Sequence, residues 1–197
     1  MSKVVGIKML EDGGAAVCEL ANGVIKDVDT YDYRDAIDEV AKIVDDNAEN
    51  NTTIITEIPS VPYNVEIIKQ LQALENEITR LKRQNHKLSG RVHLIGLTAN
   101  QWRSAYNLPT ALRSDVDASI DQVMNTLSNF SLEHLKKHWF DFTFDSFDDV
   151  DKLFRAEADA VLLAFTQYNT VLTDYTFIKD IHAEDLITKS DYTVIGR

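Results

Sequence analysis

Cysteine, proline and glycine are scarce in this chain of 197 residues. Its 7 glycines and 3 prolines are too few for a collagen-like, linker-like or loop-dominated architecture. Its single cysteine, Cys18, can form neither an intramolecular disulfide nor an all-cysteine zinc site, so we expect a reducing, cytoplasmic environment. The longest apolar run, Ala160–Phe165, is far shorter than the about 20 residues that cross a bilayer, so no membrane partner is expected.

The net charge of −12 is unevenly distributed along the chain. No Asp or Glu occurs from Ile78 to Ser114, although acidic residues outnumber basic ones 32 to 20 overall. Six basic residues of this acid-free segment are candidates for contact with nucleic-acid phosphates: Arg80, Lys82, Arg83, Lys87, Arg91 and Arg103. A basic segment between two acidic ones is typical of such a surface. The alternative is that these residues line a solvated helix face and offset their acidic neighbours.

Apolar runs separated by turn signals predict five strands, at 3–10, 15–20, 24–28, 52–56 and 91–97. The first three form a meander, because Glu11-Asp12-Gly13-Gly14 and Asn22-Gly23 between them are tight-turn sequences. Helical spacing predicts helices at 31–45, 64–88, 98–106, 115–127, 132–139 and 150–165. The fourth strand, the long helix and the fifth strand make a βαβ unit, which predicts parallel pairing with a right-handed crossover.

The helix at 64–88 repeats apolar residues at heptad spacing, with Asn85 in the one gap. A seam of this kind occurs both in coiled-coil dimers and in long helices that pack on a sheet. Three heptads are few for a coiled coil, so we favour packing on the sheet.

Three short motifs give the chain a recognisable order. A first strand with Val4-Val5-Gly6-Ile7 is followed by a strand that ends in Glu57 before Pro59, and a late helix carries Ala158-Asp159-Ala160. Together they resemble the ribonuclease H-like fold and, within it, the RuvC-type Holliday junction resolvases of divergent phage and mitochondrial kinds. The resemblance covers about residues 3–168.

The resemblance implies an α/β domain at 1–168, followed by a C-terminal extension at 169–197. The implied sheet is five-stranded and mixed, a three-strand meander plus parallel strands, and helices flank it. The basic segment is expected to lie beside the catalytic face of this domain.

The resemblance also implies a carboxylate cluster that holds two Mg²⁺ ions for phosphodiester cleavage. Glu57 fits the family's fourth-strand carboxylate and Asp159 fits its helix carboxylate. However, Lys8 stands where the family has its first-strand Asp, and Ala156 stands where it has a second helix acid. Either Lys8 neutralises Glu57 and Asp159 in place of metal, or the missing ligand lies elsewhere, for example at Asp12.

The resemblance therefore predicts a protein that binds branched or structured nucleic acid, as a homodimer because a four-way junction has two symmetric cuts. If active, it is a Mg²⁺-dependent structure-specific endonuclease, but the Lys8 substitution leads us to expect weak or absent cleavage. The alternative is a non-catalytic, phage-encoded scaffold that uses the nuclease fold for protein contacts.

Overall fold

The computed structural model describes residues 2–59, 64–108 and 147–168. Five strands form one mixed sheet in the order β3-β2-β1-β4-β5. Their bounds are β1 (Lys3–Met9), β2 (Gly14–Ala21), β3 (Val24–Asp32), β4 (Thr52–Ile58) and β5 (Val92–Thr98). β2 pairs antiparallel with both β1 and β3, whereas β4 is parallel to both β1 and β5. The predicted meander plus parallel strands is confirmed.

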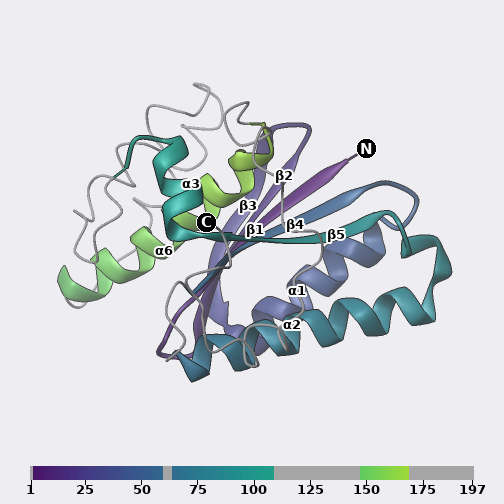
Figure 1. Ribbon diagram of the computed structural model, residues 1–197, viewed down its shortest axis with the longest axis horizontal. Helices are drawn as coiled ribbons and strands as arrows, with labels where there is room; N and C mark the ends of the chain where they lie inside the picture. Colours follow the sequence, from purple (N-terminus) through teal and green to yellow (C-terminus); the bar gives the residue numbers. More distant parts are fainter. Residues whose placement is uncertain (1, 60–63, 109–146, 169–197) are drawn as a thin grey trace.

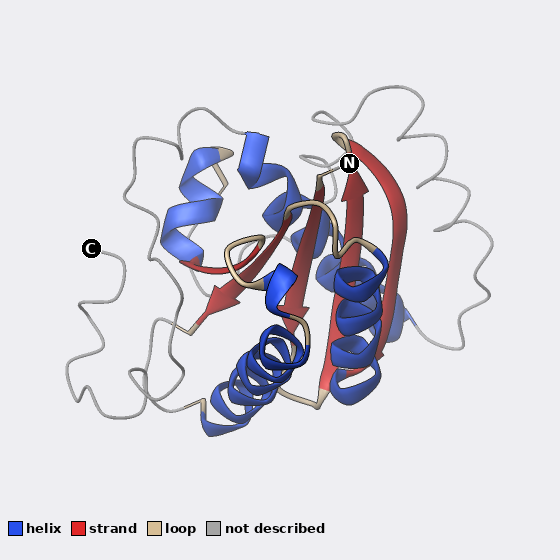
Figure 2. Cartoon of the chain, turned by 90° about the vertical axis from the view of Figure 1, so that its right-hand side faces the viewer, coloured by secondary structure: helices blue, strands red, loops and turns tan. Residues whose placement is uncertain are grey.

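Helices cover both faces of the sheet (Figures 1 and 2). On one face lie α1 (Tyr33–Asp46) and α2 (Val65–Gln84), and on the other lie α3 (Ala99–Ala105) and α6 (Phe147–Phe165) (Figure 1). Two short 3₁₀ turns follow α2 and α6, namely η1 (His86–Leu88) and η2 (Thr166–Tyr168). Among the described residues, no helix combines the length and apolarity needed to cross a membrane. The helices predicted at 115–127 and 132–139 and the extension at 169–197 lie outside the described residues.

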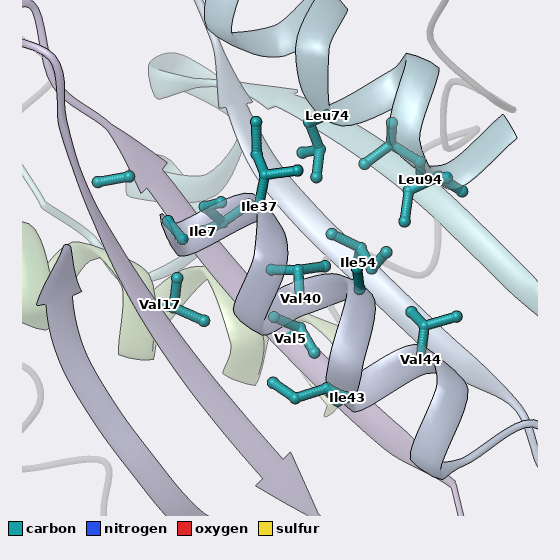
Figure 3. Close-up of a cluster of buried hydrophobic side chains, with 14 of the residues drawn as sticks. Val5, Ile7, Val17, Ile37, Val40, Ile43, Val44, Ile54, Leu74 and Leu94 are labelled. Carbon is teal, nitrogen blue, oxygen red and sulfur yellow. The ribbon is translucent and has the colours of Figure 1, made fainter. Parts of the chain in front are cut away.

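β1 is the central strand, and its side chains alternate between two apolar layers. Val5 and Ile7 pack with α1 and α2 in the cluster shown in Figure 3. Leu74 of α2 lies in the same cluster, which confirms that the heptad seam packs against the rest of the domain. Val4 belongs to the opposite layer, beneath α6. Lys8 lies four residues after Val4 on the same strand, so its side chain points to the same face of the sheet, toward α6.

α6 approaches β1 unusually closely at Gly6. A Cβ atom at this position would lie 1.9 Å from the carbonyl oxygen of Ala160 and 2.7 Å from the amide nitrogen of Ala164. Only glycine allows backbone to approach backbone at this distance. Gly6 therefore fixes the height of α6 above the sheet, and with it the position of the neighbouring Asp159.

Several predicted boundaries are wrong. β3 continues to Asp32, which caps α1 by accepting from the Arg34 amide, so the helix begins later than predicted. α2 ends at Gln84, and the Asn85 side chain accepts from the Lys87 amide and starts a separate turn. Asn side chains favour such local bonds over helix continuation, so Asn85 ends the helix instead of occupying its seam. α6 begins at Phe147, earlier than predicted.

Candidate functional site

Three side chains far apart in the sequence meet where β1 and β4 end. The parallel register pairs Ile7 with Thr56, so the next residues, Lys8 and Glu57, lie side by side on the α6 face. The Nζ atom of Lys8 is 2.7 Å from Oε1 of Glu57 and 3.7 Å from Oδ2 of Asp159, which α6 carries above the strands. The carboxyl ends of parallel strands are a common place for functional groups in α/β folds.

Glu57 has both carboxylate oxygens engaged. Oε1 contacts Lys8, and Oε2 accepts a 2.7 Å hydrogen bond from the indole Nε1 of Trp102. Trp102 lies on α3, a helix fixed at its start by a capping box between Thr98 and Gln101. Its ring is fully buried, as expected for a core tryptophan, but its N–H also holds the Glu57 carboxylate in place. No pattern in the sequence around Trp102 indicates this second role.

Asp159 is held by a second cation. NH1 of Arg103, the residue after Trp102, lies 3.6 Å from Oδ1 of Asp159. The guanidinium also stacks over the Trp102 ring at 5.1 Å from its centroid. Nearby, the Tyr106 hydroxyl donates to the carbonyl of Leu162 at 2.9 Å and ties the end of α3 to α6. Arg103, predicted as a phosphate contact, is a buried member of this cluster.

The four charged groups form two tiers. Lys8 and Glu57 are the outer pair, with side chains 18% and 20% exposed, and Arg103 and Asp159 are the inner pair, at 6% and 3%. Their formal charges cancel, since two cations face two carboxylates. Burial disfavours the charged form of Lys8, but Glu57 and Asp159 outweigh this effect and raise the pKa of the ammonium above its ordinary value.

The residues present do not fit a two-metal centre. Mg²⁺ needs oxygen ligands at about 2.0–2.1 Å. Here both oxygens of Glu57 and both oxygens of Asp159 already face N–H groups or cations of the protein. Within the described ranges, no group of three or more His, Cys, Asp or Glu side chains is arranged to hold a metal ion.

Asp12, the alternative metal ligand, makes its hydrogen bond within the turn between β1 and β2. Its Oδ1 accepts a 3.1 Å hydrogen bond from the Gly14 amide, and the neighbouring Glu11 accepts from Asn64 at the start of α2. Asp12 thus closes the turn between β1 and β2, which favours the reading in which Lys8 replaces the metal ligand.

Two further residues of α6, Ala156 and Glu157, also lie on the side of the helix that faces the sheet. Ala156 is buried in the apolar layer beneath the helix. Glu157 is buried as well and accepts from the Thr30 hydroxyl on β3 at 3.3 Å, on the far side of β2 from Glu57. Glu157 therefore points away from the pair that Asp159 makes with Lys8, as expected for residues about 200° apart on a helix.

The remaining basic candidates do not lie beside the carboxylates, so their expected position beside the catalytic face is wrong, whereas their contact with phosphates stays a prediction. α2 covers the opposite face of the sheet, and its basic end leads back to the start of β5 (Figure 1). Arg80 pairs with Glu77, and both Lys87 and Arg91 pair with Glu49. Lys82 is half-buried and Arg83 is exposed on the same segment. The acid-free segment is thus divided between two faces.

Comparison with known proteins agrees with this architecture. No family model matches the chain, and no curated protein matches its sequence. One similar solved structure is T. thermophilus RuvC in complex with Holliday junction substrate, at a TM-score of 0.55 and 10% sequence identity. The match covers 90% of this chain and 99% of that one. At this identity the likeness concerns the fold, and the chain has the ribonuclease H-like fold.

Proposed function

We propose that this protein binds branched nucleic acid without cutting it by a two-metal mechanism. The proposed binding face is formed by α3, α6 and the ends of β1 and β4, where Lys8 and Glu57 reach the surface. The likeness in fold to a resolvase bound to a Holliday junction supports the class of ligand.

One observation carries the proposal that cleavage is lost: Lys8 contacts both Glu57 and Asp159. Two-metal hydrolysis requires carboxylates that are free to hold cations about 3.5–4 Å apart. An ammonium between the two carboxylates repels a divalent ion and occupies their oxygens. Arg103 on the other side of Asp159 adds a second positive charge against such an ion.

Binding and cutting can be measured on the same labelled substrates. We expect fluorescence anisotropy to give tighter binding to a four-way junction than to duplex or single-stranded DNA or RNA of equal length. The affinity should fall with salt, by a slope of about 0.9 per phosphate contact. Denaturing gels should show no nicking with Mg²⁺ or Mn²⁺. Absence of junction binding at low salt would contradict the proposal, and so would metal-dependent nicking that Glu57→Gln abolishes.

The same proposal includes a homodimer, because the two positions that a resolvase would cut on a four-way junction are related by symmetry and each can bind one protomer. Light scattering during size-exclusion chromatography should give about twice the monomer mass. A protein that stays monomeric both alone and on the junction would contradict this part.

A second candidate function is a scaffold for protein contacts. It is favoured by the ion pairs that Glu77 makes with Arg80 and that Glu49 makes with Lys87 and Arg91, because these pairs leave fewer cations for phosphates. Equal affinity for the junction and for duplex or single strands, with no fall in affinity as salt is added, would support this candidate over the first.

A further inference from the structure

The carboxylates of the site raise a problem for any nucleic-acid ligand. Glu57 and Asp159 alone would place two negative charges where a phosphodiester backbone must approach. In a metal-dependent nuclease, bound cations remove this repulsion. The residues present do not fit such ions, so another source of positive charge is needed if the proposed function is correct.

We propose that Lys8 and Arg103 are built-in counterions of Glu57 and Asp159, and that they let this face accept a backbone phosphate without divalent cations. This inference rests on the proposed function and adds how the ligand is accommodated. It concerns the charge balance of the site and not its metal content.

The arrangement of the two tiers supports this role. The inner pair, Arg103 and Asp159, is almost fully buried, so its charges are matched within the protein. The outer pair is about one-fifth exposed, so a phosphate that reaches the mouth of the site meets Lys8 and Glu57 first. An ammonium has three N–H donors, and only two carboxylates contact it among the described residues, so one donor remains for a phosphate oxygen.

Charge balance can be separated from a specific lysine contact with two variants. Lys8→Met changes the formal charge of the four-residue cluster from 0 to −1, and the double variant Lys8→Met/Glu57→Gln returns it to 0. One unit charge about 6 Å from a phosphate, at an effective dielectric of about 40, changes affinity about tenfold. We therefore expect Lys8→Met to weaken junction binding about tenfold and the double variant to recover to within about threefold of wild type.

A matched control removes the same charge elsewhere. Lys42 lies on α1, on the opposite face of the sheet, with its side chain 66% exposed. Lys42→Met changes the net charge of the chain by the same amount as Lys8→Met, so it measures the effect of total charge alone. It should change junction affinity less than about twofold. A thermal melt of each variant checks that it is folded at the temperature of the binding assay.

The wild-type protein provides a second measurement that does not depend on variants. Junction affinity is compared in EDTA and in Mg²⁺ at equal ionic strength, and we expect the two values to agree within about twofold. Binding that requires Mg²⁺ would overturn the counterion role while leaving the proposed function intact. No junction binding in either buffer would overturn both.

The variants give the remaining outcomes. Equal affinity of Lys8→Met and wild type would overturn the inference, and so would a double variant that stays as weak as the single one. If Lys8→Met does not fold, the comparison of wild type in EDTA and Mg²⁺ decides.

Discussion

The contact between β1 and α6 at Gly6 allows a quantitative test of how the site is positioned. In Gly6→Ala the new Cβ would lie 1.9 Å from the Ala160 oxygen and 2.7 Å from the Ala164 nitrogen. Both atoms belong to the backbone, so no side chain can rotate away, and α6 must move by more than about 1 Å to restore an ordinary contact. Overpacking a core costs about 1–3 kcal/mol, and we expect a loss near the upper limit.

Urea unfolding and thermal melts measure this loss. For a domain of this size, a loss of about 3 kcal/mol lowers Tm by about 6–12 °C. Gly14→Ala is the matched control, because its Cβ would meet side-chain atoms of Asp12 and Leu10 at 3.3 Å and the backbone oxygen of Tyr31 only at 3.6 Å, an ordinary van der Waals distance. That variant should lose less than about 1 kcal/mol. A Gly6→Ala protein as stable as Gly14→Ala would refute the close packing that brings Asp159 to Lys8.

Three further predictions concern the site and its surroundings. Trp102→Phe keeps an aromatic ring but removes the N–H that Glu57 accepts, so urea unfolding should show a loss of about 1.5–3 kcal/mol, and no measurable loss would contradict the contact. Because folding raises the pKa of Lys8 above its ordinary 10.5, the stability difference between wild type and Lys8→Met should be constant from neutral pH up to about that value. It should shrink as pH rises through the higher pKa of the folded state, and a difference that grows there would contradict the ion pairs. Burial raises the pKa of the Cys18 thiol well above its usual range, so Ellman's reagent should label it only as fast as the protein unfolds.

The sheet could be predicted from the sequence because its signals are local. Asn22 and Gly23 both adopt positive φ, 52° and 76°, which is the geometry that an Asn-Gly hairpin turn requires. The apolar stretch Val4–Ile7 belongs to a strand buried on both faces, as its lack of alternation indicates. Lys8, Glu57 and Asp159 are far apart in the sequence, so their convergence could be expected only from the resemblance to the ribonuclease H-like fold.

The rest of the site could not be predicted, because its contacts depend on the three-dimensional arrangement of the layers. A heptad seam shows which side of α2 is apolar, but it does not show which face of the sheet the helix covers. The basic residues of α2 were therefore expected beside Glu57, although they lie on the opposite layer. Similarly, nothing in the sequence around Trp102 and Arg103 distinguishes a buried cation from a surface one.

Calorimetric titration of the wild-type protein with Mn²⁺ tests most directly whether protein cations take the place of metal at Glu57 and Asp159. If the ammonium of Lys8 and the guanidinium of Arg103 satisfy the two carboxylates, no saturable binding attributable to Glu57 should be observed. Tight binding of two Mn²⁺ ions that is lost in Glu57→Gln would contradict the account.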